Sequence, residues 1–223
     1  MRLPKYLSRR LVLASQSPRR IELLRLTGLS FLQKDPQIDE SKQTGESPKS
    51  YAQRLAREKA TAVMKRQNDD SIVLAADTIV VHNDAILGKP SSADHAEQML
   101  SRLQGKTHKV VTAIALARTK SGEMTEESCS TYVRVRQFSH QGRRDYIASG
   151  DPLDKSGSYG IQNPQFRPAT TLGGCLANVI GLPLCHVSLA LSDLGMPPST
   201  DVPQACQVPV SYTHLTLPTI LLV

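Results

Sequence analysis

The sequence contains few aromatic residues and no tryptophan, which restricts both its core and the ligands it can stack. Phe, Tyr and Trp together make up 4% of the 223 residues. The core must therefore be built from Leu, Val, Ile and Ala. Nucleic-acid surfaces of the stacking type present bases with aromatic side chains. The Tyr and Phe residues here are few and dispersed, which weighs against that class of protein.

Cysteine and long apolar runs are also scarce. The four cysteines, Cys129, Cys175, Cys185 and Cys206, form no C-x-x-C pair, so we expect no structural zinc site. No stretch approaches the roughly 18 apolar residues of a membrane span. The apolar run at residues 11–14 is too short for the h-region of a secretory signal. We therefore expect a cytoplasmic protein with free thiols and no membrane partner.

Positive charge is in excess, but it is not concentrated in a tail. The formal net charge is +7 and the pI is about 9.4, and no run of five or six like charges occurs. An excess of Lys and Arg suits a polyanionic partner, such as nucleic acid, an anionic membrane or a phosphorylated small molecule. Charge alone leaves these three open, together with the simpler alternative of a solvated basic surface.

Apolar segments with strand and helix patterns alternate along the first two thirds of the chain. This order predicts an α/β or mixed α+β class with one main core. The segment 1–196 is expected to form the domain. The Pro/Ser/Thr-rich segment 197–223 is expected to be disordered or foreign to it. Predicted strands cover 11–14, 71–82, 85–87, 108–118 and 125–138, and predicted helices begin near residues 18, 48, 91, 141 and 182.

The first motif that carries chemistry is the segment LASQSPRRIELL. A strand, a serine-rich turn and the start of a helix at Pro18 would gather backbone N–H groups at one point. Ser15 and Ser17 add hydroxyl groups, and Arg19 and Arg20 add forked donors suited to phosphate oxygens. The P-loop pattern is absent. The alternative is a capped helix with two solvated arginines.

A second motif places Asp77 within the apolar segment LAADTIVV. A carboxylate in a buried strand is costly unless it is paired, bound to metal or functional. Asp77 could activate water, or hold a divalent metal ion that does so. The alternative is that it caps a loop or pairs with a lysine.

Further candidates are spaced along the chain. Lys59, Lys89 and Lys155 could neutralise a polyphosphate, although each alone is more simply a surface lysine. The acidic pair Asp39–Glu40 could complete a metal site. Gln162 offers both a donor and an acceptor, as the recognition of a base edge requires.

Six sequence blocks occur in an order that resembles the Maf family of nucleotide pyrophosphatases. The resemblance runs from about residue 11 to residue 195. It implies an elongated mixed sheet with flanking helices, two lobes around a deep cleft, and a fold like that of inosine triphosphatases. The blocks are LASQSPRRIELL, SPKSYAQRLAREKA, LAADTIVV, ILGKP, LDKSGSYGIQ and NVIGLPL.

The resemblance also implies a reaction and a set of site residues. Hydrolysis would occur between the α- and β-phosphates of a nucleoside triphosphate, with Mg²⁺ or Mn²⁺ as cofactor. The family's catalytic carboxylate maps onto Asp77, and Glu40 joins Asp77 as a metal ligand. A homodimer is also expected. The substrate-binding positions map onto Ser15, Ser17, Arg19, Arg20, Lys59, Lys89 and Lys155.

Three residues, Arg19, Thr78 and Gln162, are similar to those of the branch that acts on dTTP and UTP. Modified pyrimidine nucleotides are included in that expectation. Two alternatives stay open at this point. One is the same fold acting on methylated or noncanonical purine triphosphates. The other is a non-catalytic basic module that binds nucleic acid or a protein partner.

Overall fold

Residues 9–202, which the computed structural model describes, form one mixed β-sheet flanked by helices. The strand order is β2-β1-β3-β5-β6-β7, and β4 also pairs with β3. β1 runs parallel to β2 and β3, whereas the other pairs are antiparallel. The strands are β1 (Arg10–Ala14), β2 (Phe31–Lys34), β3 (Ser71–His82), β4 (Ala85–Leu87), β5 (Thr107–Arg118), β6 (Met124–Val135) and β7 (Ala169–Gly173).

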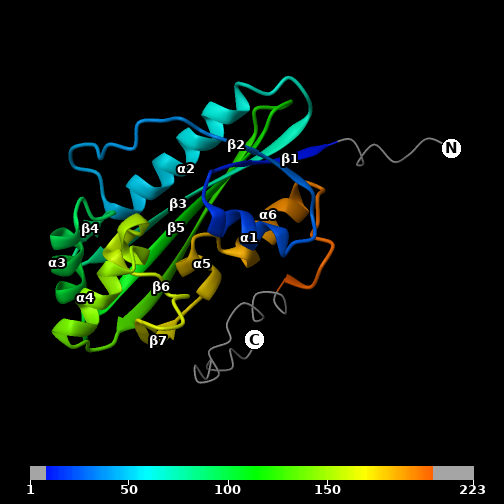
Figure 1. The fold of residues 1–223 in the computed structure, drawn as a ribbon. Coiled ribbons are helices and arrows are strands. Elements are labelled where there is room, and N and C mark those ends of the chain that lie inside the picture. Colours follow the sequence, from blue (N-terminus) through cyan, green and yellow to red (C-terminus); the bar gives the residue numbers. More distant parts are fainter. Residues whose placement is uncertain (1–8, 203–223) are drawn as a thin grey trace.

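The helices are distributed over both faces and one end of this sheet. α2 lies along one face, α1, α5 and α6 lie on the other, and α3 and α4 gather at one end (Figure 1). The predicted mixed sheet with flanking helices is therefore confirmed. The helices are α1 (Pro18–Arg25), α2 (Pro48–Met64), α3 (Ala93–Leu103), α4 (His140–Ala148), α5 (Leu176–Ile180) and α6 (Leu184–Asp193), with 3-10 turns at Asp151–Asp154 and Ser156–Ser158.

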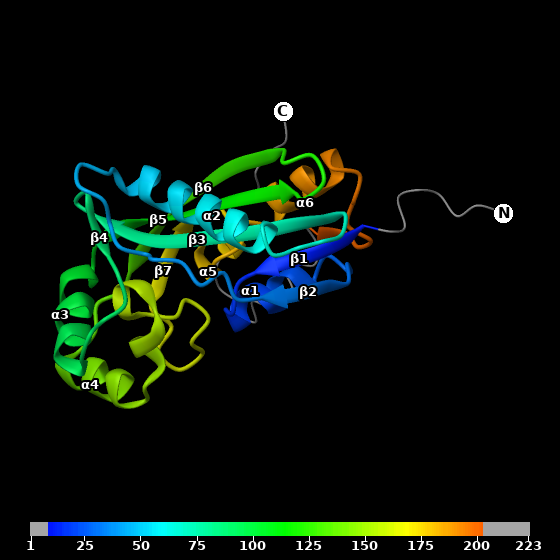
Figure 2. The ribbon, with the colours of Figure 1, turned by 90° about the horizontal axis from the view of Figure 1, so that it is seen from above.

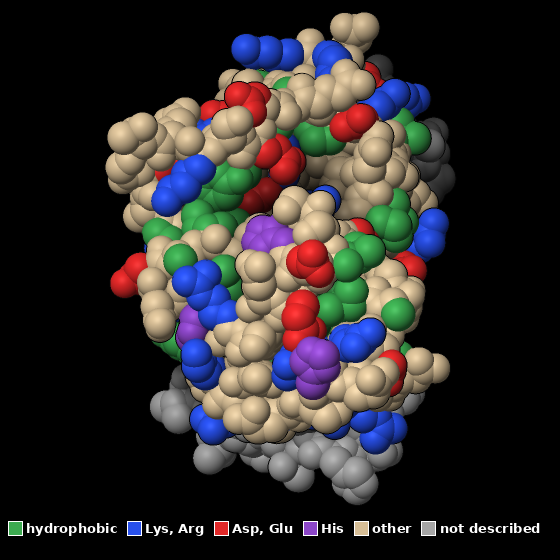
Figure 3. Space-filling view, turned by 60° about the vertical axis from the view of Figure 1, so that its left-hand side comes forward, with side chains coloured by type: hydrophobic (Ala, Val, Ile, Leu, Met, Phe, Trp, Pro, Cys, Tyr) green, Lys and Arg blue, Asp and Glu red, His purple; other side chains and the backbone are tan. Residues whose placement is uncertain are grey.

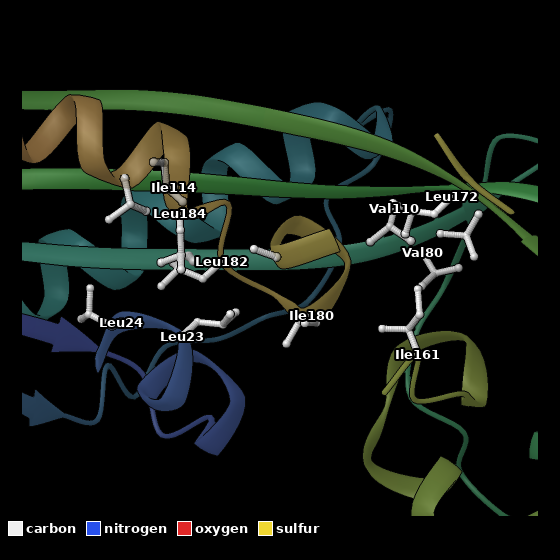
Figure 4. Close-up of a cluster of buried hydrophobic side chains, with 14 of the residues drawn as sticks. Leu23, Leu24, Val80, Val110, Ile114, Ile161, Leu172, Ile180, Leu182 and Leu184 are labelled. Carbon is white, nitrogen blue, oxygen red and sulfur yellow. The ribbon is translucent and has the colours of Figure 1, made fainter. Parts of the chain in front are cut away.

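Strand alternation divides the core into two clusters, one on each face of the sheet. Successive side chains of a strand point to opposite faces. Val73 and Ala75 of β3 therefore pack with the alanines of α2, whereas Leu74 and Ala76 pack with α1 and α5. Figure 4 shows part of the second cluster, with Leu182 between α1 and the sheet. β3 and most of β5 are thus buried on both faces, as the nearly continuous apolar run in β3 predicts, whereas β6 is partly exposed.

One edge of β3 is interrupted in its middle. β1 pairs with β3 only as far as Leu74, and β4 joins the same strand at Val80. Between these two points, neither strand covers residues 75–79 of β3. Seen from above, the end that carries α1 and the end that carries α3 and α4 project to the same side of the long strands (Figure 2). Asp77 and Thr78 lie in this gap and face the space between the two ends.

Most of the predicted elements are confirmed, and serines cap the starts of α2 and α3. Ser47 accepts a hydrogen bond from the backbone N–H of Ser50 at the start of α2, and Ser92 does the same for α3. The sequence analysis missed β2, β7 and α5. These elements are four or five residues long, too short to show a hydrophobic period.

The segment after residue 196 is described only as far as Val202. Within it, the backbone N–H of Ser199 donates to the carbonyl of Thr27 at 2.9 Å, and Val202 is buried against the main core. Residues 203–223 of the predicted tail lie outside the described residues. No helix within residues 9–202 is long and apolar enough to cross a membrane.

Candidate active site

A cavity of about 1040 Å³ opens at the interrupted edge of β3. Its wall combines the β1–α1 turn, the loop before α2 and the segment from Asp151 to Pro164. A hollow with acidic side chains in its wall is visible in the space-filling view (Figure 3). All eleven predicted site residues line the cavity, although 147 positions separate the first from the last: Ser15, Ser17, Arg19, Arg20, Glu40, Lys59, Asp77, Thr78, Lys89, Lys155 and Gln162.

A lysine bridges two carboxylates at the centre of this cavity. Lys59 Nζ lies 2.7 Å from Asp77 Oδ1 and 2.7 Å from Glu40 Oε1. The side chains of Lys59 and Asp77 are 7% and 8% exposed, whereas that of Glu40 is 59% exposed. Partial burial raises the pKa of Glu40, but the hydrogen bond and charge of Lys59 outweigh it and bring the pKa below its usual value. One alternative for Asp77 was that it pairs with a lysine. Asp77 does pair with Lys59, and Lys59 is itself a predicted site residue.

Arg20 reaches the opposite wall of the cavity. Its Nε donates to the carbonyl of Gly181 at 2.9 Å, its Nη2 to Thr78 Oγ1 at 3.1 Å and its Nη1 to Ser15 Oγ at 3.4 Å. Burial lowers the pKa of Arg20, and the nearby Asp77 charge opposes this. Among the described residues, no carboxylate forms an ion pair with it. A partly buried cation held only by neutral oxygens favours an anionic ligand.

Thr78 connects Arg20 to a second threonine that the sequence analysis did not identify. Thr112 Oγ1 donates to the carbonyl of Asn178 at 2.9 Å. Because a hydroxyl carries one proton, Thr112 must accept in its 2.9 Å contact with Thr78. The resulting chain of bonds runs from Arg20 through Thr78 and Thr112 to α5. Thr112 is 34 positions from Thr78 in sequence, and no motif links the two.

Replacing Thr112 by Val is expected to lower kcat/KM for a substrate bound in this cavity about fivefold, mainly through KM. One neutral hydrogen bond contributes on the order of 1 kcal/mol, and its loss frees Thr78 to turn away from Arg20. Steady-state kinetics measure the effect, and Thr112→Ser is the matched control because it keeps the hydroxyl group. Wild-type kcat/KM in Thr112→Val, or an equal loss in Thr112→Ser, would contradict the role of the hydrogen bond.

Asp154 pairs with both Arg19 and Lys155, and Asp151 also pairs with Lys155; neither acidic residue was predicted. Lys155 Nζ lies 2.7 Å from Asp154 Oδ1 and 3.0 Å from Asp151 Oδ1. Arg19 Nη1 lies 3.3 Å from Asp154 Oδ2. Arg19 therefore does not contact Thr78, which is hydrogen-bonded to Arg20 instead. Both cations already have carboxylate partners here, unlike Arg20.

The remaining predicted residues occupy the rim and floor of the cavity. Ser15 is buried and its Oγ accepts from the backbone N–H of Ser17 at 3.1 Å. Ser17 precedes α1 without a side-chain capping bond, which leaves the first N–H groups of that helix for a ligand. Lys89 is exposed and its charge acts on Glu40. Gln162 lies on the wall formed by residues 159–164.

A buried histidine supports Tyr159 in the same wall. His108 Nε2 lies 2.7 Å from Tyr159 Oη. Burial lowers the pKa of His108 from 6.5 to about 4, and the charge of His82 adds to this. His108 is thus neutral at physiological pH and supports the position of Tyr159.

The neutral state of His108 predicts a loss of stability in mild acid. Between pH 6.5 and about 4 the unfolded chain binds a proton that the folded chain does not, so stability falls as the pH falls. The contribution lost at pH 5 is roughly 2 kcal/mol. Urea unfolding at pH 7 and pH 5 measures it. His108→Gln should reduce the difference between the two pH values. The exposed control His140→Gln should retain the wild-type difference, and a reduction in both variants would contradict the assignment.

The donor set in the cavity fits a hard divalent cation. Asp77 and Glu40 offer carboxylate oxygens on either side of Lys59. Within residues 9–202, no cluster of three or more His, Cys, Asp or Glu side chains could hold a metal ion alone. Mg²⁺ is commonly held by one or two carboxylates together with substrate phosphates. The two carboxylates therefore suit an ion that arrives with a phosphorylated substrate.

The fold and cavity together define a class of protein. A buried carboxylate–lysine pair faces a guanidinium without an ionic partner at the interrupted edge of a sheet. Neutral oxygens hold the guanidinium in place, so its charge is available to an anion. This arrangement suits a pocket that binds a phosphorylated small molecule.

The sequence comparisons identify the family within this class. Residues 10–194 match the family model described as Maf-like protein, and the chain belongs to the Maf family. A dTTP/UTP pyrophosphatase of Photorhabdus laumondii is 45% identical over 174 residues, covering 78% of this chain and 88% of the relative. A protein of the same name from Thermomicrobium roseum is 43% identical over 202 residues, covering 88% and 91%.

A solved structure also resembles this fold at a distance. The HAM1 protein from Coxiella burnetii is 17% identical, with a TM-score of 0.46, over 82% of this chain and 98% of that chain.

Proposed function

We propose that this chain is a dTTP/UTP pyrophosphatase, which cleaves the triphosphate to a monophosphate and pyrophosphate. The observation that carries the proposal is the buried Asp77–Lys59 pair facing Arg20 across one cavity. Relatives at 43–45% identity over more than three quarters of the chain bear the same name. The predicted enzyme class therefore agrees with its relatives and with the charges in the pocket.

In the proposed mechanism, Asp77 takes the proton of the attacking water. Lys59 Nζ binds Oδ1 of Asp77 at 2.7 Å and fixes the carboxylate, so that Oδ2 accepts the proton. Attack at the α-phosphorus breaks its bond to the bridging oxygen and places negative charge on the departing pyrophosphate. Arg20, Lys59 and Lys89 offset this charge in a fixed, partly dry site.

Glu40 and Asp77 are the residues that would hold Mg²⁺ or Mn²⁺. A bound divalent ion would polarise the phosphate oxygens and neutralise part of their charge. Lys59 keeps the two carboxylates close together before the ion binds, at 2.7 Å from each. It thereby limits the repulsion between them.

Pyrimidine recognition is assigned to the wall that contains Gln162. Its amide supplies both a donor and an acceptor for a base edge. Thr78, one of the three predicted specificity residues, accepts a hydrogen bond from Arg20, and in this proposal it also positions the phosphate-binding group. Arg19 is held by Asp154 at the rim, where it can meet the phosphate tail. The homodimer and the cytoplasmic location remain part of this proposal.

A substrate panel tests the proposal. Pyrophosphate release is measured with dTTP, UTP, CTP, 7-methyl-GTP and ITP, in the presence of Mg²⁺ or Mn²⁺. We expect the fastest turnover with dTTP and UTP. Faster turnover of 7-methyl-GTP or ITP would contradict the preference for pyrimidines but would leave the proposed release of pyrophosphate intact. If the folded protein, supplied with metal, turned over none of these triphosphates, the proposed enzymatic activity would be rejected. A non-catalytic binding module would then be favoured.

A further inference from the structure

Two cysteines that are 46 positions apart in sequence meet between β6 and the start of α5. In the pairing of β5 with β6, Cys129 lies opposite Thr112. It is two residues before Thr131, on the same face of β6. Both threonines bind the α5 segment. Thr112 donates to the carbonyl of Asn178, and Thr131 Oγ1 bonds to the carbonyl and the N–H of Cys175 at 3.1 and 3.0 Å. The backbone of Cys175 is therefore held beside the part of β6 that carries Cys129.

The backbone beside Cys175 lies directly on β6. A Cβ atom added at Gly174 would come within 3.2 Å of the Thr131 Cα atom, which is closer than ordinary packing allows. The thiols of Cys129 and Cys175 lie close enough that each shifts the pKa of the other. Both residues are free and only partly buried, so a small solute such as peroxide can reach them.

We propose that Cys129 and Cys175 form a thiol modification site, in which peroxide converts the pair to a reversible disulfide that disturbs the nucleotide pocket. The effect on catalysis rests on the proposed function, whereas the formation of the disulfide does not. No motif in the sequence indicates this pair, because the two residues become neighbours only in the folded sheet.

Cys175 is the residue that reacts first. The contact with the Cys129 thiol, together with backbone N–H groups at the start of α5, lowers the pKa of Cys175 against the effect of burial. One of these groups, the N–H of Asn178, donates to Cys175 Sγ at 3.4 Å. The same thiol contact raises the pKa of Cys129. Cys175 therefore forms the thiolate, the reactive form, more readily, and Cys129 is the resolving thiol.

The proposed reaction balances with hydrogen peroxide as the oxidant. The Cys175 thiolate attacks one peroxide oxygen, the O–O bond breaks, and the departing hydroxide takes a proton to become water. The sulfur of Cys129 then attacks the sulfenic sulfur of Cys175. Its S–O bond breaks, and the oxygen leaves as water with the proton of Cys129. Two thiols lose two electrons, and one peroxide gives two waters.

The disulfide would reach the pocket through α5. A disulfide brings the two sulfurs to about 2.0 Å and so draws Cys175 towards β6. The following residues supply two carbonyls to the site: Asn178 accepts from Thr112, and Gly181 accepts from Arg20 at 2.9 Å. A shift of this segment displaces Arg20. We expect a three- to tenfold lower kcat/KM, which corresponds to the loss of about one hydrogen bond.

Peptide mapping by mass spectrometry tests the modification in the full-length chain. Purified protein is treated with hydrogen peroxide, digested without reductant and compared with a sample restored by dithiothreitol. We expect a peptide that links Cys129 to Cys175 and disappears on reduction. In Cys129→Ser, dimedone should trap the sulfenic acid of Cys175, whereas Cys185→Ser should still form the link. A missing link, or one that joins Cys175 to Cys185, would overturn the pairing.

Kinetics on the same samples test the coupling to the pocket. The wild-type enzyme and Cys185→Ser should lose activity with peroxide and recover with dithiothreitol, whereas Cys129→Ser should not show the disulfide-dependent loss. Full activity in a fully cross-linked sample would overturn the coupling. Absent turnover in the reduced protein counts against the proposed function alone, because the link is measured independently of activity.

Discussion

Replacing Asp77 by Asn is expected to lower kcat for dTTP and UTP by a factor on the order of 10²–10⁴, the range of a general base. The amide keeps the shape of the side chain but can no longer accept the proton of the attacking water. Stability should change little, because Lys59 retains Glu40 at 2.7 Å. Initial rates of pyrophosphate release measure the loss, and unfolding in urea checks that the variant is folded.

The matched control is Asp84→Asn, which makes the same change in the exposed turn between β3 and β4. It should retain wild-type kcat and the same metal requirement. Near-normal turnover in Asp77→Asn would exclude Asp77 as the proton acceptor. The carboxylate of Glu40, 2.7 Å from the same lysine, would then be the next candidate.

Replacing Lys59 by Met is expected to have the largest effect on stability, lowering the free energy of unfolding by about 3 kcal/mol. The Asp77 side chain is only 8% exposed, so removing its lysine leaves a buried charge without compensation. Most of the cost arises from that unpaired carboxylate, and little from the lost attraction itself. Urea unfolding at pH 7 measures the difference between the variant and the wild-type protein.

The double variant Lys59→Met/Asp77→Asn separates these two contributions. Removing the charge of Asp77 as well should recover much of the stability lost in Lys59→Met, because no unpaired ion remains. Glu40→Gln is the control, because Glu40 is the exposed partner of Lys59, with 59% of its side chain accessible. This variant should lower the free energy of unfolding by less than about 1 kcal/mol. Equal losses in Lys59→Met and the double variant would contradict the role of the buried charge.

Much of the fold could be predicted from local patterns. The continuous apolar run of β3 predicts a strand buried on both faces, and Ser47 before Pro48 predicts the start of α2. The sequence motifs also predicted which residues of these elements belong to the site. Alternation along β3 also separates Asp77 from Thr78, so that one side chain meets Lys59 of α2 and the other meets Arg20 of α1.

The partners of the site residues could not be predicted, because they depend on tertiary packing. Neighbouring residues of a helix point about 100° apart, and the sequence alone did not show whether Arg19 or Arg20 would reach Thr78. Thr112 and the Gly181 carbonyl are separated from their partners by 34 or more positions. The pairing of Lys155 with Asp151 and Asp154 was likewise missed, although the residues are close in sequence.

The identity of the products from dTTP and UTP tests the central claim most directly. Chromatography of the nucleotide products, together with an assay for released phosphate species, shows which anhydride bond is cut. The account predicts dTMP and UMP, each with one equivalent of pyrophosphate, and no diphosphate intermediate. Formation of dTDP and UDP with inorganic phosphate would place the attack at the γ-phosphorus and contradict the account.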